Sequence, residues 1–242
     1  MMGARWSWML VLATLLASSA GAQTRDEQLR ACAGLGGETP DARIKACSAV
    51  IAGGQEGSDR LAAVFFNRGN AYVATRQLWP AVADYDQVIR VKPASPIAFT
   101  NRGSVFHRLG LYDRAIQDFD QAVTLSPDDA LALTDRCLDL AIVGKLSEAL
   151  ADCEQALALR PNSASTLGSR ALANLKAGRS QAALADYDHA LAASAPVAGW
   201  LFGRGVAKTR LGDRTGGSAD IAAAQRLEPD IARQYERYGV RL

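Results

Sequence analysis

The sequence contains few of the side chains that catalysis and metal binding usually require. Its 242 residues include only two histidines, His107 and His189, on different expected helices and with no catalytic serine motif beside them. A nucleophilic enzyme needs a base next to a serine, threonine or cysteine, and a zinc site needs clustered cysteine and histidine ligands. The four cysteines form no C-x-x-C pair. The sequence therefore predicts no enzyme, no metal site and no cofactor.

The distribution of charge, glycine and apolar residues excludes further classes of protein. The formal net charge is only +2, and basic residues interleave with acidic ones instead of clustering, which argues against a nucleic-acid partner. Gly216 and Gly217 precede no Lys-Ser/Thr pair, so no phosphate-binding loop is expected. The chain is 49% hydrophobic and 21% charged, which is typical of a folded protein and not of a disordered one.

The first 22 residues differ in composition from the rest of the chain. Arg5 provides a basic start, an apolar run covers residues 8–16, and residues 20–22 read Ala-Gly-Ala, the small-x-small pattern of a cleavage site. This run is shorter than the ~20 residues of a membrane span, and no later segment approaches that length. We predict a signal peptide over residues 1–22, cleavage near Ala22, and a periplasmic or secreted chain without stable membrane insertion. An uncleaved N-terminal anchor is the alternative.

A pattern of 34 residues occurs five times between residues 62 and 229. Each copy has an arginine before a small residue and an aspartate 16 residues later. The arginines are Arg68, Arg102, Arg136, Arg170 and Arg204, and the aspartates are Asp84, Asp118, Asp152, Asp186 and Asp220. A strict period of this length indicates a solenoid, in which each copy is one supersecondary unit.

Each copy predicts two amphipathic helices, because its apolar and small residues recur every three or four positions. In the second copy, Pro96 suits the first turn of a helix, Gly110 marks the turn between helices, and Pro127 ends the second helix. The five copies span residues 62–95, 96–129, 130–163, 164–197 and 198–229. The expected fold is all-α.

The pattern resembles the tetratricopeptide repeat family. The second copy supplies the family's aromatic, small and proline positions, which here are Phe99, Gly103, Ala115, Phe119 and Pro127. The fifth copy departs most, with Gly217 in place of alanine and Ile221 in place of the second aromatic. The resemblance implies a right-handed α-solenoid, with residues 23–61 as a helical half-repeat at one end and residues 230–242 as a capping helix over the last repeat.

The repeated arginines and aspartates allow two interpretations. They could form a charged track for a ligand, or they could form structural ion pairs within and between repeats. Both residue types flank the seam between the two helices of a copy, and the planar arginine fork binds a carboxylate through two hydrogen bonds. We favour the structural interpretation.

The four cysteines are expected to form two disulfides, because an even number in an exported chain favours pairing. Cys32 and Cys47 bracket the expected hairpin before the repeats. Cys137 and Cys153 occupy the small and the aromatic position of the third copy, which face each other in a helical hairpin. We predict the pairs Cys32–Cys47 and Cys137–Cys153. Two small buried residues without a disulfide are the alternative for the second pair.

The resemblance implies that a ligand binds the concave groove, which the first helix of each copy lines. The expected groove residues are Phe66, Asn67, Asn70, Thr100, Asn101, Ser104, Arg108, Asp135, Leu138 and Leu172. Amide and hydroxyl groups come first along the groove and apolar groups later. This surface suits an extended peptide or a helix whose backbone contacts the asparagines.

One known binding mode of the family is not expected here. Members that bind chaperones hold a terminal carboxylate with a clamp of asparagines and basic residues. The chain has Asn70 and Asn101, but Phe66, Leu131 and Asp135 stand where the clamp is basic. The expected function is a non-catalytic protein- or peptide-binding scaffold or adaptor in the cell envelope. The alternative is a structural role, in which copies of the chain associate through the glycine-rich fifth repeat.

Overall fold

The computed structural model describes residues 24–241, which form thirteen α-helices and no strand. The predicted signal peptide and its cleavage site near Ala22 lie outside the described residues. The helices are α1 (Arg25–Ala33), α2 (Pro40–Gly53), α3 (Ser58–Ala74), α4 (Leu78–Val91), α5 (Pro96–Arg108), α6 (Tyr112–Leu125), α7 (Ala130–Val143), α8 (Leu146–Leu159), α9 (Ala164–Lys176), α10 (Ser180–Ala192), α11 (Ala198–Arg210), α12 (Arg214–Leu227) and α13 (Ile231–Arg237).

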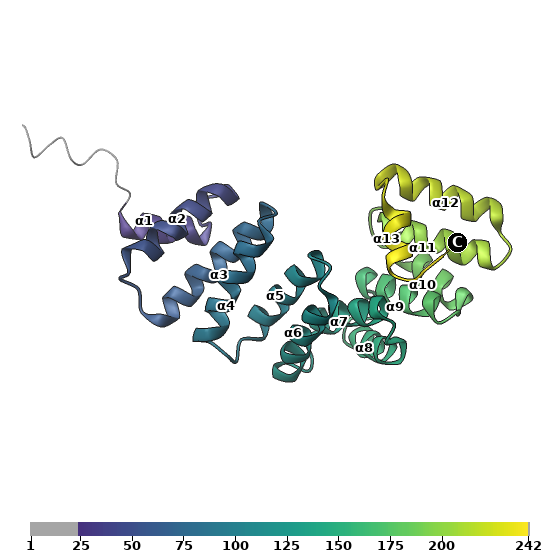
Figure 1. The fold of residues 1–242 in the computed structure, drawn as a ribbon, viewed down its shortest axis with the longest axis horizontal. Coiled ribbons are helices and arrows are strands. Elements are labelled where there is room, and N and C mark those ends of the chain that lie inside the picture. The colour runs from purple at the N-terminus through teal and green to yellow at the C-terminus, as the bar shows by residue number, and fades with distance from the viewer. Residues whose placement is uncertain (1–23, 242) are drawn as a thin grey trace, which may run out of the picture.

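Successive helices pack as hairpins along an arc that runs from α1 to α12 (Figure 1). The hairpin α1–α2 comes first, and five repeats follow as α3–α4, α5–α6, α7–α8, α9–α10 and α11–α12. Helix α3 begins at Ser58, four residues before the expected first copy. The predicted all-α solenoid is therefore confirmed, and the N-terminal segment before the repeats forms the hairpin α1–α2.

Each turn between the two helices of a repeat needs one residue in the left-handed region of backbone space. Four repeats place a glycine there, with φ between 75° and 96°: Gly110, Gly144, Gly178 and Gly212. The first repeat has Arg76 at this position, with φ of 60°, which makes it the only non-glycine residue of positive φ among the described residues. A side chain in this conformation costs roughly 1–2 kcal/mol. Arg76 is thus a strained departure from the repeat.

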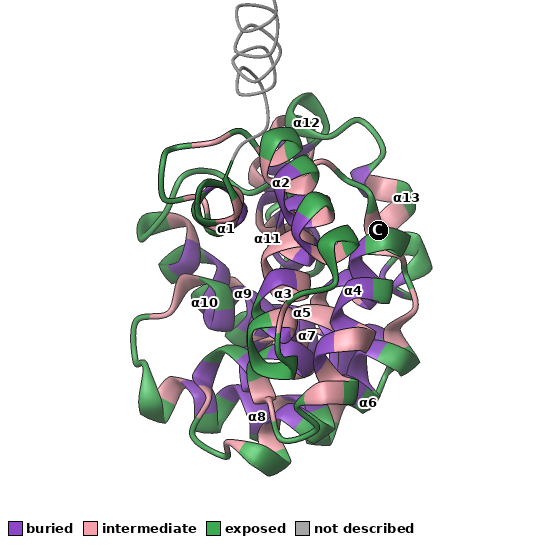
Figure 2. Ribbon diagram, turned by 90° about the vertical axis from the view of Figure 1, so that its left-hand side faces the viewer, coloured by how far each residue is buried: buried purple, intermediate pink, exposed green. Residues whose placement is uncertain are grey.

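In the first two repeats, a glycine on the first helix faces an aromatic ring on the second helix: Gly69 faces Tyr85, and Gly103 faces Phe119. A Cβ atom added to Gly103 would lie 2.7 Å from the Phe119 ring, so the glycine is what allows α5 and α6 to approach. Buried residues gather on these facing sides, and exposed residues cover the outside of the arc (Figure 2).

The third repeat holds a disulfide in the same position. Cys137 of α7 bonds to Cys153 of α8, with 5.6 Å between their Cα atoms, and both residues are fully buried. The second disulfide joins Cys32 of α1 to Cys47 of α2. Each bridge therefore ties the two helices of one hairpin together, at a sequence separation of 15 or 16 residues.

The repeated arginines and aspartates pair across each hairpin. In every repeat the guanidinium donates two hydrogen bonds of 2.6–2.8 Å to the aspartate of the same repeat. Three arginines also donate to an acid of the preceding repeat: Arg102 to Asp86, Arg136 to Asp120 and Arg204 to Asp188. These second bonds connect neighbouring hairpins, so the arginines join repeats as well as helices.

Within residues 24–241, the other two arginines have no second acid: the third group that Arg68 donates to is the hydroxyl of Ser48 in α2, and Arg170 has none. Among the described residues, Arg170 forms hydrogen bonds with Asp186 alone. In the preceding repeat, Glu154 stands where the first, second and fourth repeats have aspartate, and Arg170 forms no hydrogen bond with Glu154. Asn174 donates a further bond of 3.3 Å to Asp186. The fourth repeat is therefore joined to the third by one ion pair fewer.

Candidate binding groove

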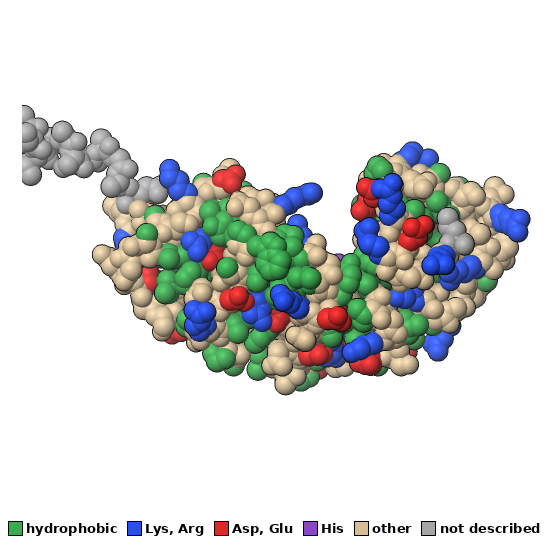
Figure 3. Space-filling view, viewed as in Figure 1, with side chains coloured by type: hydrophobic (Ala, Val, Ile, Leu, Met, Phe, Trp, Pro, Cys, Tyr) green, Lys and Arg blue, Asp and Glu red, His purple; other side chains and the backbone are tan. Residues whose placement is uncertain are grey.

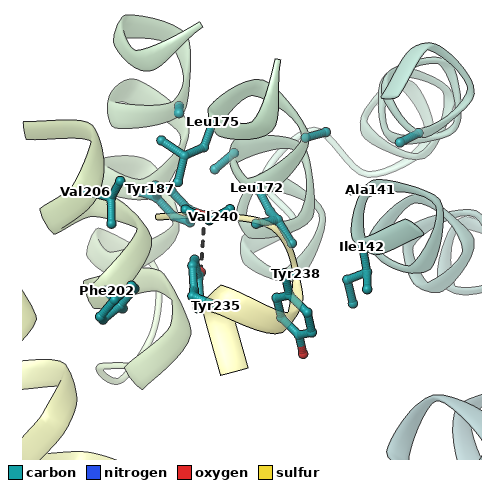
Figure 4. Close-up of a cluster of buried hydrophobic side chains, with 14 of the residues drawn as sticks. Ala141, Ile142, Leu172, Leu175, Tyr187, Phe202, Val206, Tyr235, Tyr238 and Val240 are labelled. Carbon is teal, nitrogen blue, oxygen red and sulfur yellow. Dashed lines mark hydrogen bonds between the residues drawn. The ribbon is translucent and has the colours of Figure 1, made fainter. Parts of the chain in front are cut away.

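The C-terminal segment does more than cover the last repeat. Residues 231–240, here called the tail, lie against the first helices of the third, fourth and fifth repeats, on the inner side of the arc (Figures 1 and 4). Ile231, Tyr235, Tyr238 and Val240 are buried there, with exposed fractions between 1% and 7%. They belong to one apolar cluster with residues of α7, α9 and α11.

Tyr235 anchors the tail. Its hydroxyl donates a hydrogen bond of 2.6 Å to the carbonyl of Gly199, and its ring lies 4.8 Å from that of Phe202 (Figure 4). The hydroxyl of Tyr187 in the neighbouring α10 lies 3.4 Å away. Burial raises the pKa of both phenols, so they stay neutral hydrogen-bonding groups at physiological pH.

The tail closes the C-terminal half of the groove, meaning the inner surface formed by α9 and α11. Leu172, Leu175, Phe202 and Val206 pack in the same cluster as the tail, and Leu172 is only 3% exposed. The sequence predicted Leu172 as a ligand-contacting residue. In the structure, Leu172 belongs to the same apolar cluster as the tail. The tail thus covers this apolar half of the groove, because burying apolar surface is favourable.

The N-terminal half of the groove, formed by α3 and α5, is here called the open half because its apolar cluster contains no residue of the tail. Asn70 and Asn101 are half-buried there. Asn101 donates a hydrogen bond of 3.1 Å from its Nδ2 to Oδ1 of Asn70, and the hydroxyl of Tyr85 donates one of 2.7 Å to the same oxygen. Tyr85 is 1% exposed. A buried phenol thus fixes the orientation of the Asn70 amide.

The remaining predicted groove residues differ in how far they are buried. Phe66 and Asn67 are half-buried, and Phe66 packs edge-on against Tyr85 at 6.0 Å. Thr100 is only 3% exposed and donates to the carbonyl of Pro96 in its own helix, so it presents no surface to a ligand. Leu138 is half-buried and lines the space in front of the tail.

Two clefts lie where the open and the closed halves meet. The central cleft has a volume of about 290 Å³ and is lined by residues of α5, α7, α9 and α11 together with Tyr235 and Tyr238 of the tail. The second cleft, of about 650 Å³, lies between the turns after α3 and α5 and the end of α13. The space-filling view shows a deep notch in this part of the molecule, with basic side chains on both sides (Figure 3).

His107 and Asp139 form a buried pair beneath the notch, which the sequence did not predict. His107 Nδ1 lies 2.5 Å from an oxygen of Asp139, and Asp139 is 0% exposed. Burial alone would lower the pKa of His107, but the hydrogen bond and charge of Asp139 raise it above its ordinary value. The signal in the sequence was an aspartate inside the apolar run of residues 138–143. A buried acid of this kind requires a partner.

Asp135 is one of the two acids that line the central cleft, the other being Glu228. Its carboxylate accepts a hydrogen bond of 3.2 Å from Ser104, another predicted groove residue. Burial raises the pKa of Asp135 to about 6, against the lowering effects of Ser104 and His107. The carboxyl is therefore close to half-protonated in mildly acidic conditions.

The described residues offer no metal site and no membrane span. In the range 24–241, no group of three histidine, cysteine, aspartate or glutamate side chains is placed to hold a metal ion. Of the helices described, none is long and apolar enough to cross a membrane.

The fold and the groove define an α-helical repeat protein of the solenoid class. A scan against known protein families matches the tetratricopeptide repeat at residues 66–130 and 139–198, which together make up more than half of the chain. The chain belongs to the tetratricopeptide repeat family.

Several solved structures share this fold. A tetratricopeptide repeat protein from Parabacteroides merdae has a TM-score of 0.67 at 17% identity, over 95% of this chain and 90% of that one. The pilF protein of Pseudomonas aeruginosa has a TM-score of 0.64 at 20% identity, over 86% and 95%. YrrB, described as a TPR protein with an unusual peptide-binding site, has a TM-score of 0.56 at 18% identity, over 77% and 94%. A search of curated proteins found no match.

Proposed function

We propose that the chain is a non-catalytic adaptor of the cell envelope, which binds an extended peptide segment of a partner protein in the open half of its groove. The observation that carries this proposal is the fixed amide pair of Asn70 and Asn101. Oδ1 of Asn70 accepts from both Tyr85 and Asn101, which leaves its NH₂ group to donate to a ligand. Within the described residues, the side-chain oxygen of Asn101 accepts no hydrogen bond.

One donor and one acceptor side by side match the N–H and C=O groups of an extended peptide backbone. Both amides are held before the ligand arrives, so little side-chain entropy is lost on binding. A structural neighbour, YrrB, is itself described as having a peptide-binding site, which agrees with this use of the fold.

The envelope location rests on the predicted signal peptide and on the two disulfides, since disulfides persist mainly in oxidising compartments. Two glycines of the fifth repeat, which motivated the self-association alternative, have a role inside the repeat. A Cβ atom on Gly217 would lie 2.7 Å from the carbonyl oxygen of Gly205, so both glycines serve the close packing of α11 and α12.

The test compares capture of envelope proteins by residues 23–242 with capture by the variant Asn70→Asp. This change keeps an acceptor for Tyr85 but removes the NH₂ donor, so it alters the ligand contact with little change inside the fold. We expect a specific partner to be lost from Asn70→Asp and retained by Asn162→Ala, which changes an exposed asparagine far from α3 in the repeat series. A partner captured equally by both variants would contradict binding at the amide pair.

A further inference from the structure

The second cleft of the notch, here called the arginine cleft, is lined by charged side chains of positive sign only. Its lining includes Arg76 from the turn after α3, Arg108 from the end of α5 and Arg237 from the end of α13, together with His107. No aspartate or glutamate is part of the lining. Three segments that are distant in the sequence thus bring three positive charges to one cleft.

None of these three arginines forms an ion pair with another residue in the range 24–241, and all three are exposed. This separates them from the five arginines of the repeat pattern, each of which has its own aspartate. Arg108 is oriented by a hydrogen bond of 3.4 Å to the carbonyl of Val73, at the end of α3, which holds its guanidinium on the side of Arg76.

The backbone of Arg76 is an independent observation. Four of the five repeats place glycine at this turn, and the first repeat carries an arginine there in spite of a positive φ. Strain of this kind persists where the side chain has a use that the surroundings maintain. At this position the side chain lines the arginine cleft.

The arginine cleft adjoins the central cleft. His107, Gln234 and Tyr238 line both, and the central cleft adds the apolar side chains of Leu138, Leu172 and Trp200. A ligand that spans them therefore meets guanidinium groups in the arginine cleft, and apolar groups beside the acids Asp135 and Glu228 in the central cleft. Acidic groups of a ligand are thus favoured in the arginine cleft and apolar groups in the central one. Guanidinium groups bind carboxylates through paired, charge-assisted hydrogen bonds.

We propose that the arginine cleft binds the carboxylate groups of an acidic peptide segment that continues from the open half of the groove. This inference rests on the proposed function and names the chemistry of its ligand. The basic surface is confined to one cleft of about 650 Å³ on a chain of net charge +2, which fits a short acidic segment better than a nucleic acid. The site differs from a clamp on the first helices, because Arg76 comes from a turn and Arg237 from the tail.

The experiment measures binding of a fluorescent dodecapeptide of alternating glutamate and leucine, and of the same peptide with glutamine in place of glutamate. The intact chain should bind the glutamate peptide at least about tenfold more tightly at low salt, since each charge-assisted bond contributes a factor of this size. The preference should shrink in high salt.

The decisive variant is Arg76→Gly, because it restores the glycine of the other four repeats. Its midpoint of thermal unfolding should not fall, while its preference for the glutamate peptide should drop by about tenfold. Arg237→Gln should have the same effect from the other side of the cleft. Arg226→Gln, which removes an exposed arginine at the end of α12, is the matched control and should leave both affinities unchanged.

Equal affinity for the two peptides, or an unchanged preference in Arg76→Gly, would overturn the inference. In that case the proposed function stands if the glutamine peptide still binds and loses affinity in Asn70→Asp. Failure of both peptides to bind would overturn the proposed function together with the inference. Tighter binding of a single-stranded DNA oligonucleotide than of the glutamate peptide would contradict the assignment of an acidic protein segment.

Discussion

The two halves of the groove are built from the same repeat but have different surroundings. In the half formed by α3 and α5, Asn70 and Asn101 are half-buried and hydrogen-bond to each other, and the apolar cluster of this half contains no residue of the tail. In the half formed by α9 and α11, apolar groups such as Leu172 and Phe202 pack with the tail. The comparison shows that the same kind of repeat surface is covered by the chain itself in one half and is free of the tail in the other.

The largest expected effect concerns the anchor of the closed half. Tyr235→Ala should lower the free energy of unfolding by about 3–5 kcal/mol, because it removes a buried ring and its hydrogen bond to Gly199. Urea unfolding measures the change. Arg233→Ala, on the exposed side of the same helix, should stay within about 0.5 kcal/mol. A loss below about 1 kcal/mol for Tyr235→Ala would show that the tail is not part of the packed core.

The arginine pairs allow the two halves to be compared directly. Asp186→Ala in the closed half leaves Arg170 with no carboxylate, whereas Asp118→Ala in the open half leaves Arg102 with Asp86. Removing one partner of a buried ion pair costs about 3–5 kcal/mol. We expect a loss near that range for Asp186→Ala and about 1–2 kcal/mol less for Asp118→Ala, because its arginine keeps a partner. Equal losses in chemical denaturation would contradict a role for the second carboxylate.

The disulfide of the third repeat occupies a position that the second repeat fills with glycine and phenylalanine. Cys137→Ala/Cys153→Ala should lose about 3 kcal/mol under oxidising conditions, since the closed loop and a filled core are both lost. Cys137→Gly/Cys153→Phe recreates the Gly103–Phe119 pair and should recover about half of that loss. Thermal unfolding of the two variants provides the measurement. If the glycine–phenylalanine variant were the less stable of the two, the positions would not be equivalent.

The smallest expected effect concerns Asp135, at the boundary between the two halves, and its contribution to the free energy of unfolding depends on pH. The pKa of Asp135 is raised to about 6, so between about pH 4 and pH 6 the folded chain binds a proton that the unfolded chain has released. The wild type should therefore lose stability as pH rises through this window. Asp135→Asn removes the contribution: it should be about 1–3 kcal/mol more stable than wild type at pH 7 and nearly equal at pH 4. A difference independent of pH would contradict the raised pKa.

Much of the fold follows from the period of the sequence. Each repeat contains its own helix signals at fixed spacing, so its hairpin is specified locally, and the family assignment follows from the same positions. The sequence also places both members of each arginine–aspartate pair at the seam. Which acid of the preceding repeat accepts the second bond depends on the angle between hairpins, which no single repeat encodes.

The position of the tail was not predictable in the same way. Ile231, Tyr235 and Tyr238 form an apolar stripe at helical spacing, which indicates that the last helix is buried but not against which surface. That choice depends on the apolar groups of α9 and α11, which are tens of residues away in the sequence. The His107–Asp139 pair is also a contact between repeats, at a separation of 32 residues, and periodicity alone does not reveal it.

The most direct test of the difference between the open and the closed half of the groove is hydrogen exchange of the intact chain with and without the glutamate–leucine peptide. The account predicts that residues 231–240 exchange as slowly as α9 and α11 in the free chain. The bound peptide should add protection in α3, α5, their turns and the end of α13, where Arg237 lines the arginine cleft. The contrary result is faster exchange of residues 231–240 in the presence of the peptide. It would mean that the peptide displaces the tail and binds the half of the groove that we describe as closed.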